Sequence, residues 1–228
     1  MMLGDCSLDP GGIAPVTVSY LIVAGGGFGS IRGGGGAGGL LEGTCILDSS
    51  INNITVGAGG NYGNGGNSLL NGIIAYGGGY GGINAPASNG GSGGGRHLSN
   101  AYGLGILGQG HNGSPDIGTD GAVYPASNGG GAGVTDDGVL TYTRTGRTSS
   151  ITGTSTVYAT GGKGYTGGST IANTGNGGNG AGLLGASGIV VVKVPLAMPS
   201  VGGTIILSVP GYRIHKFTNV GASQLILG

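Results

Sequence analysis

The side chains that could do chemistry are concentrated in one segment of this chain, residues 96–160. The 228-residue chain has eight Lys and Arg residues and eight Asp and Glu residues, and seven of these charges fall in that segment. Polar and aromatic side chains on loops held by a rigid scaffold are typical of a recognition surface. The candidates for ligand contact are Tyr102, His111, Asp116, Asp120, Tyr124, Asp136, Asp137 and Arg144.

These residues do not follow a metal-binding or catalytic pattern. His97, His111 and His215 are far apart in the sequence, and neither a Cys-x-x-Cys nor a His-x-x-x-His pair occurs. The four aspartates could converge on Ca²⁺, but the D-x-D-x-D-G spacing of a calcium loop is absent, so solvated loop charges are the favoured interpretation. No spacing of Ser, Asp and His indicates a nucleophile with its base. We therefore expect a protein that is not an enzyme and that binds neither a metal nor a cofactor.

Glycine-rich stretches raise the question of a nucleotide site. Residues 16–39 read VTVSYLIVAGGGFGSIRGGGGAGG, and Gly33, Gly35 and Gly38 formally satisfy G-x-G-x-x-G. A dinucleotide site needs a helix directly after the glycines, because the pyrophosphate lies at the helix N-terminus. The residues that follow, GLLEGTCIL, are too short and glycine-broken for that helix. Lys163, in GGKGYT, lacks the following Ser or Thr of a P-loop.

The tyrosines permit two interpretations. Their rings could cover glycine runs that have no side chains of their own, or they could form a platform for sugars or a receptor loop. Covering is favoured in general, whereas the two interpretations stand equal for Tyr102 and Tyr124. The tyrosines in or beside glycine runs are Tyr62, Tyr76, Tyr80, Tyr102, Tyr124, Tyr158 and Tyr165.

Composition sets limits on the protein's class. Its formal net charge is zero and its pI about 6.8, so no basic patch favours nucleic-acid binding. No segment reaches 18 consecutive apolar residues, so we expect no membrane insertion. The N-terminus lacks the pattern of a secretory signal. Cys6 and Cys45 are interpreted as free thiols in a protein made in the cytoplasm rather than as a disulfide pair.

Glycine content determines the expected fold. Glycine makes up 62 of 228 residues, against roughly 7% in average proteins. Glycine helices with three residues per turn can pack side by side, and their backbone groups can then bond between neighbours. We predict an all-β fold in which short strands are combined with packed polyglycine-II-type helices and almost no α-helix. The runs expected to pack are 33–39, 57–66, 77–82 and 175–180, with Gly33, Gly35, Gly38, Gly57, Gly66, Gly78, Gly177 and Gly178 as structural glycines.

The chain divides by composition into three parts. Residues 1–14 form an N-terminal arm, residues 15–195 a glycine-rich domain, and residues 196–228 a set of C-terminal strands. Alternation in 16–23 places Val16, Val18, Tyr20 and Ile22 on one face of a strand and the intervening residues on the other. Within 96–160 we expect variable loops and a hairpin of 139–143 with 148–159. TIILSV, YRIHKFT and SQLIL are predicted to be three strands separated by turns.

Three stretches carry a family resemblance. VSYLIVAGGGFGS with the GGGGAGG after it, ITVGAGGNYGNGGNS, and GGNGAGLLGASGIVVVKVP resemble, in that order, the glycine-rich domain of tailed-phage tail fibres, tail-tip proteins and adhesins. The resemblance covers about residues 15–195. It implies a glycine core that resembles polyglycine-II packing and variable loops that recognise a host surface.

One segment departs from the family pattern. A strand pair that normally precedes the first strand of the domain has its likeness at 211–227, GYRIHKFTNVGASQLIL. We predict that this segment lies antiparallel beside 16–23 or 189–194, since an unpaired strand edge must be covered. Pairing with another subunit makes it an oligomer clasp, with a trimer favoured; pairing within the chain makes the domain a circular permutant. His215 is interpreted as a strand histidine rather than a ligand.

The expected function is therefore that of a virion structural protein, as a phage tail fibre or tip component that contacts the host surface receptor. Its partners would be other virion proteins, further copies of the chain, and a host surface glycan or protein. One alternative is a capsid-decorating or head-fibre protein without a receptor role. Another is an ice- or surface-binding polyglycine bundle, which the irregular segment 96–160 disfavours.

Overall fold

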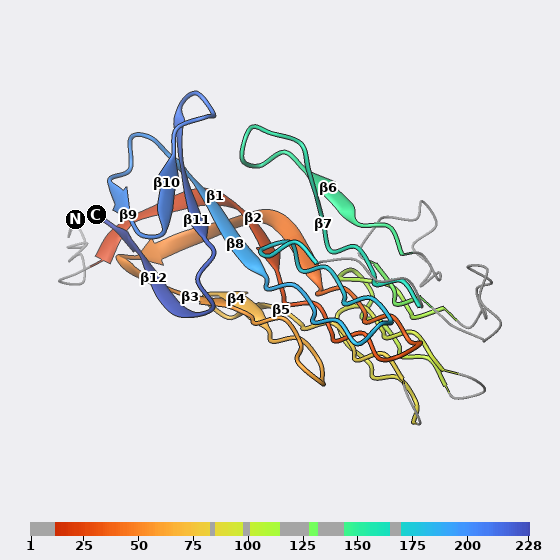
Figure 1. The fold of residues 1–228 in the computed structure, drawn as a ribbon. Helices are drawn as coiled ribbons and strands as arrows, with labels where there is room; N and C mark the ends of the chain where they lie inside the picture. The colour runs from red at the N-terminus through yellow and green to blue at the C-terminus, as the bar shows by residue number, and fades with distance from the viewer. Residues whose placement is uncertain (1–11, 83–84, 98–100, 115–127, 132–143, 165–169) are drawn as a thin grey trace, which may run out of the picture.

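A computed structural model describes residues 12–82, 85–97, 101–114, 128–131, 144–164 and 170–228. The regular secondary structure of these residues is β-strand, with no α-helix, as the sequence predicts. Two five-stranded antiparallel sheets form one part of the molecule, and glycine-rich runs lie side by side in the other (Figure 1). Within these described ranges no helix is long and apolar enough to span a membrane.

The first sheet has the strand order β10-β11-β8-β1-β2. Its strands are β1 (Gly12–Val23), β2 (Leu40–Ser49), β8 (Ile189–Pro195), β10 (Thr204–Ile206) and β11 (Tyr212–Phe217). The second sheet has the order β5-β4-β3-β12-β9. Its strands are β3 (Ile51–Val56), β4 (Ser68–Leu70), β5 (Ile73–Ala75), β9 (Ser200–Val201) and β12 (Gly221–Leu227).

The two faces of β1 contribute to two cores, which confirms the predicted alternation. Val18 and Ile22 pack with β8, β3 and β12 side chains between the two sheets. Leu21 and Val23 lie on the opposite face, where the β6–β7 hairpin covers the sheet. That hairpin joins β6 (Arg147–Ser149) to β7 (Thr156–Tyr158). The predicted hairpin paired 139–143 with 148–159; residues 139–143 lie outside the described residues, and the observed hairpin forms instead within 147–158.

The C-terminal strands pair within the chain. β11 is antiparallel to β8, with His215 opposite Val192, as predicted for a strand beside 189–194. β12 instead joins the second sheet, antiparallel to β3. The two strands thus occupy interior positions in different sheets, which is the intrachain alternative of the sequence analysis. The expected three C-terminal strands correspond to β10, β11 and β12.

The buried histidine of β11 connects the sheets. His215 is fully buried; its Nδ1 lies 2.7 Å from the Gly202 carbonyl oxygen and its Nε2 lies 2.9 Å from Ser200 Oγ. Burial lowers the pKa of His215, the hydrogen bond to Gly202 partly offsets this, and Arg213 lowers the pKa further. Ser200 belongs to β9 of the second sheet, so the contact between His215 Nε2 and Ser200 Oγ links the two sheets.

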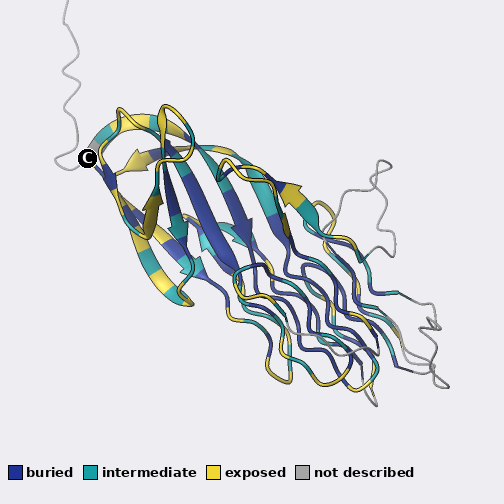
Figure 2. Cartoon of the chain, turned by 45° about the horizontal axis from the view of Figure 1, so that its top comes forward, coloured by how far each residue is buried: buried dark blue, intermediate teal, exposed yellow. Residues whose placement is uncertain are grey.

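The glycine runs form a bundle whose interior is backbone. They are assigned neither helix nor strand and are largely buried (Figure 2). Along 24–30, N–H groups three residues apart donate to the same neighbouring run. Ala24, Gly27 and Ser30 donate to residues 33–39, Gly25 and Phe28 to residues 63–66, and Gly26 and Gly29 to residues 183–186.

This period of three is what side-by-side packing of three-residue-per-turn helices requires, because every third residue faces the same neighbour. The predicted hydrogen bonds between runs are therefore present. The polyglycine-II form of each run stays a prediction.

Asparagine side chains replace a neighbouring run along part of the bundle. Four backbone N–H groups donate to asparagine Oδ1 atoms at 2.8–2.9 Å, again in pairs three residues apart. The donor–acceptor pairs are Gly77–Asn67, Tyr80–Asn64, Thr160–Asn176 and Lys163–Asn179. Both asparagine pairs come from an N-G-G-N sequence, so one local motif supplies two acceptors at the spacing that the bundle needs.

Candidate functional site

The bundle holds the described parts of segment 96–160 through backbone hydrogen bonds. Gly103 donates to Gly94, Gly113 donates to Gly103, and Gly130 donates to Gly93, at 2.8–2.9 Å. The segment is thus threaded through the bundle at several points rather than attached at its two ends. This is the rigid support that a recognition surface needs.

Three of the eight predicted contact residues are described. Tyr102 and Arg144 are half-buried and His111 is buried. The His111 N–H donates to the Gly131 carbonyl, and the Arg144 carbonyl also lies against Gly131, so these two residues share a neighbour. Tyr102 belongs to a different run. The other five, Asp116, Asp120, Tyr124, Asp136 and Asp137, lie outside the described residues.

The glycines singled out by sequence sit where neighbouring backbones come closest. A Cβ atom would lie closer than 3.0 Å to a backbone atom at seven of the eight positions and 3.0 Å from one at Gly66. At Gly35 the atom in the way is the Gly27 carbonyl oxygen, and at Gly177 it is the Gly35 carbonyl oxygen. The other positions are Gly33, Gly38, Gly57, Gly78 and Gly178. Backbone cannot move aside as a flexible side chain can, so the neighbouring run leaves no room for a side chain at the seven close positions.

Two tyrosines cover an aromatic side chain of the bundle. The Phe28 ring stacks on Tyr62 at 4.6 Å and on Tyr80 at 6.0 Å between centroids. Phe28 is buried, whereas Tyr62 is 82% exposed and has a left-handed φ of 55°. These two tyrosines thus stack on an aromatic ring, and the covering of glycine runs by tyrosine stays a prediction.

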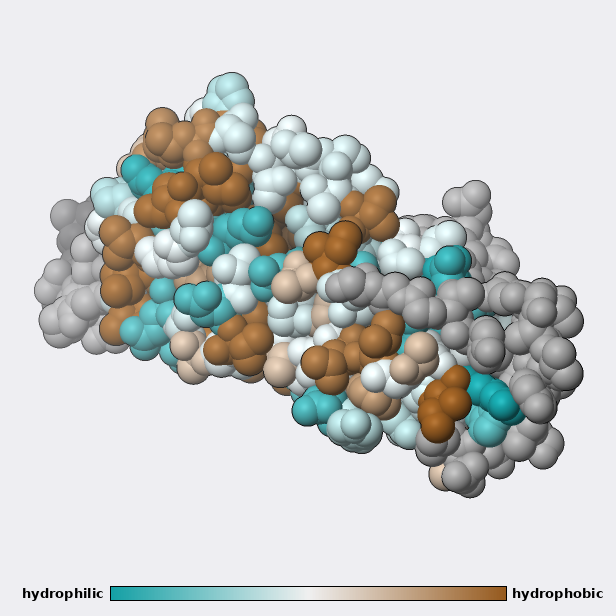
Figure 3. Space-filling view, viewed as in Figure 1, coloured by the Kyte–Doolittle hydropathy of each residue, from teal (hydrophilic) through white to brown (hydrophobic). Residues whose placement is uncertain are grey.

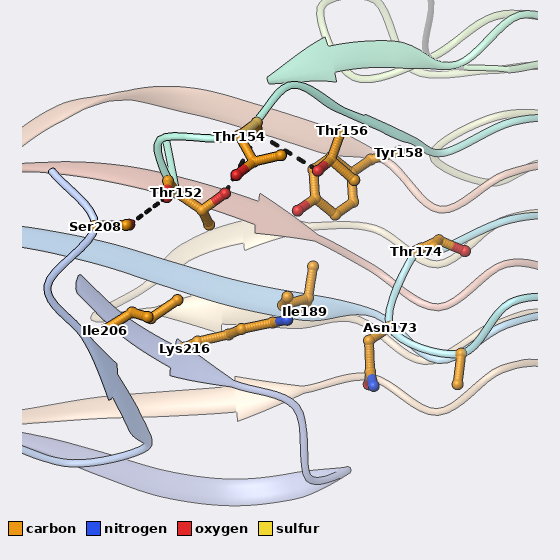
Figure 4. A pocket seen from close by; sticks show the side chains of 11 residues that line it. Thr152, Thr154, Thr156, Tyr158, Asn173, Thr174, Ile189, Ile206, Ser208 and Lys216 are labelled. Carbon is orange, nitrogen blue, oxygen red and sulfur yellow. Dashed lines mark hydrogen bonds between the residues drawn. The ribbon is translucent and has the colours of Figure 1, made fainter. Parts of the chain in front are cut away.

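A groove lies between the β6–β7 hairpin and the first sheet, with a volume of ≈ 350 Å³ (Figure 4). Thr152, Thr154 and Thr156 form its upper wall in this view, and Lys216 of β11 runs along the opposite wall toward Ile189. The remaining lining residues are Tyr158, Ala172, Asn173, Thr174, Ile206 and Ser208. The site therefore combines hydroxyl groups, one ammonium group and an apolar floor.

Local geometry positions the hydroxyl wall. Thr152 and Thr156 hydroxyls both donate to the Thr154 carbonyl at 3.4 Å, and the Ser208 hydroxyl donates to the Thr152 carbonyl. These contacts fix the turn of the hairpin and join it to the loop before β11. Burial raises the pKa of the Tyr158 phenol, Thr156 lowers it in part, and the charge of Glu42 raises it again. The phenol is therefore neutral near pH 7 and can donate a hydrogen bond.

Sequence reasoning did not identify this groove. Its hydroxyl wall belongs to segment 96–160, but the candidates chosen there were charged or aromatic. The sequence feature that could have indicated the groove is the set of threonines at alternate positions of TGTST, residues 152–156. Lys216 could not have been assigned to the groove, because it reaches the hairpin only through the pairing of β11 with β8.

The remaining chemistry to account for is that of the cysteine thiols and of possible metal ligands. Cys45 is a free thiol on β2, and burial raises its pKa, so it is a poor nucleophile. Cys6 lies outside the described residues. In the part of the chain that the structure places, no three His, Cys, Asp or Glu side chains converge as metal ligands would.

Comparison with known proteins gives one match. The sequence model of a family described as a glycine-rich domain matches residues 13–195. No curated protein and no solved structure matches the chain. The matched range contains the whole glycine bundle, the β6–β7 hairpin and strands β1 to β8 apart from the first residue of β1.

Proposed function

This chain belongs to the glycine-rich domain family, and we propose that it is a non-enzymatic structural protein of a virion, a tail fibre or tip component that contacts the host surface. The observation that carries the proposal is the bundle, in which glycine runs pack through backbone hydrogen bonds and hold segment 96–160. Such a core tolerates variation in the loops, because its packing does not depend on their side chains.

The sheets supply a surface for assembly with other virion proteins. β10 is an edge strand of the first sheet, and Leu207 beside it is 66% exposed. Figure 3 shows apolar side chains gathered over this part of the molecule. Exposed apolar groups next to an unpaired strand edge favour pairing with another chain, which supports placement in an assembly, with further copies of the chain or other virion proteins as partners.

Immunoelectron microscopy tests this function. Antibodies against the purified protein would be applied to particles released by the source culture. Label on tail fibres or the tail tip is the expected result, and the purified protein should then compete with particles for adsorption to host cells. Label on the capsid would favour the decorating or head-fibre alternative. Particles without label would contradict a virion role.

A further inference from the structure

We propose that the groove between the β6–β7 hairpin and β11 binds a hexuronic acid unit of a saccharide, with Lys216 contacting its carboxylate and the threonine wall contacting its hydroxyls. This inference rests on the proposed contact with a host surface and names the chemistry of that contact.

The positive charge in the groove is the ammonium group of Lys216. Lys216 is half-buried, and the described residues give its ammonium no hydrogen-bond or ion-pair partner. Glu42, which contacts the hairpin, accepts a hydrogen bond from Ser149 Oγ at 2.7 Å. Partial burial of an unpaired charge is unfavourable, and a carboxylate bound in the groove would offset that cost with charge-assisted hydrogen bonds.

The hydroxyl wall has free hydrogen-bonding capacity. The Thr152 hydroxyl uses one weak donor bond, at 3.4 Å, and retains its acceptor lone pairs, whereas the Thr156 hydroxyl also hydrogen-bonds the Tyr158 phenol. The Thr154 side chain is exposed, and in the described structure its hydroxyl makes no hydrogen bond. The Thr152 and Thr154 hydroxyls on one wall match a ligand that itself carries several neighbouring hydroxyls.

The floor distinguishes a sugar from a simple anion. Ile189, Ile206 and the Tyr158 ring contribute apolar surface to the same groove. Inorganic phosphate gains nothing from such a surface, whereas a pyranose ring presents C–H groups on its face and hydroxyls at its edge. The volume of ≈ 350 Å³ lies within the range of about 300–1,000 Å³ typical of small-ligand sites.

Titration calorimetry of the purified full chain with tri-galacturonic acid at pH 7 tests the proposal. The trimethyl ester of the same trisaccharide keeps the skeleton without the charge, and inorganic phosphate supplies charge without the skeleton. We expect the acid to bind, the ester to bind at least tenfold more weakly, and phosphate not to displace the acid at equal concentration.

Variants connect the binding to the groove. Lys216→Met should weaken binding of the acid at least tenfold, and Thr154→Val should weaken it several-fold. Lys193→Met is the matched control and should leave the affinity unchanged, because the Lys193 ammonium lies 4.8 Å above the Tyr212 ring and does not line the groove. Unfolding midpoints equal to that of the wild type would verify that the variants fold.

Four results would overturn the proposal: no binding of the acid, equal affinity for acid and ester, displacement by phosphate, or equal losses in the two lysine variants. The titration uses purified protein alone, so its failure leaves antibody labelling of particles intact. Conversely, unlabelled particles together with specific binding of the acid would contradict the virion role and not the groove.

Discussion

At Gly35 a methyl group would meet the carbonyl oxygen of Gly27, and no side chain is there to move aside. We expect Gly35→Ala to lower the free energy of unfolding by about 1–3 kcal/mol or more, the range for overpacking a close-packed interior. Gly63→Ala is the matched control, because a Cβ at Gly63 meets nothing within 4 Å and its φ is not positive. That substitution should be neutral or stabilise by about 0.4–1 kcal/mol. Equal denaturation midpoints for the two variants would contradict steric packing of the runs.

His215 should make stability fall in mild acid. Burial holds its pKa in the folded chain below the ordinary value of 6.5. Below that value the unfolded chain takes up a proton that the folded chain does not, so the free energy of unfolding should decrease as pH falls from 7.5 to 5.5. Chemical denaturation across this range measures the slope, and His215→Gln should flatten it. A slope that the substitution leaves unchanged would assign the effect to other groups.

Residue identity alone predicted the two faces of β1 and the strand role of His215. It did not predict the groove, since Thr152 and Lys216 are separated by 64 positions and meet only through sheet pairing. It also did not predict that asparagine side chains accept hydrogen bonds from backbone N–H groups along part of the bundle. An asparagine beside a glycine is as typical of a turn as of a side chain that accepts a hydrogen bond from another run. Which of the two it forms depends on whether another run lies next to it.

At the scale of elements, the N-G-G-N motifs should stabilise the edge of the bundle. Asn64 accepts a hydrogen bond from Tyr80 N–H at 2.8 Å and donates one to the Asn89 carbonyl at 3.1 Å. We expect Asn64→Ala to cost about 1–2 kcal/mol, at roughly 1 kcal/mol for each hydrogen bond, and to speed hydrogen exchange at Tyr80 N–H. Asn64→Asp retains the acceptor oxygen and should preserve that protection.

Asn61→Ala provides the control for the cap. Asn61 precedes Asn64 by three residues, is exposed, and makes no hydrogen bond in the described structure. Its substitution should change neither stability nor exchange at Tyr80. If Asn61→Ala and Asn64→Ala behaved alike, the amide cap would have no specific role.

The positions of the strands were easier to predict from the sequence than which strands pair with one another. Alternation indicated the strand at 16–23, and turns indicated the three C-terminal strands. β2 was missed, because LLEGTCILDS contains a glycine and no clean alternation. The structure supplies the reason for Gly43, which lies under the Tyr20 ring of the neighbouring strand β1, with a Cβ there 3.0 Å from the phenol oxygen.

At the scale of the whole molecule, the first and last described strands meet at one place. Gly12 of β1 pairs with Ser49, and Leu227 N–H donates to the Ser50 carbonyl. A circular permutant that begins at Gly211 and ends at Pro210, with Gly228 joined to Met1, should therefore fold with nearly unchanged stability. The new ends fall in the exposed turn before β11, the kind of site where permutation is tolerated.

Truncation after Pro210 is the comparison for the permutant. It removes β11 and β12, which lie inside the two sheets and pair with β8 and β3. We expect the truncated chain to lose cooperative unfolding, as followed by circular dichroism on heating. A truncated chain that unfolded like the full one would show that these strands are dispensable and would contradict their place in both cores.

The central claim is that glycine runs form the hydrogen-bonded core of the bundle, and native-state hydrogen exchange on glycine-labelled protein tests it most directly. The N–H groups of Gly25, Gly27, Gly36 and Gly78 each donate to another run at 2.8–3.0 Å. We predict that they exchange as slowly as the N–H of Val191 in β8, with opening free energies close to that of global unfolding. Exchange of these glycines at the rate of an unstructured chain, while Val191 stays protected, would contradict the account.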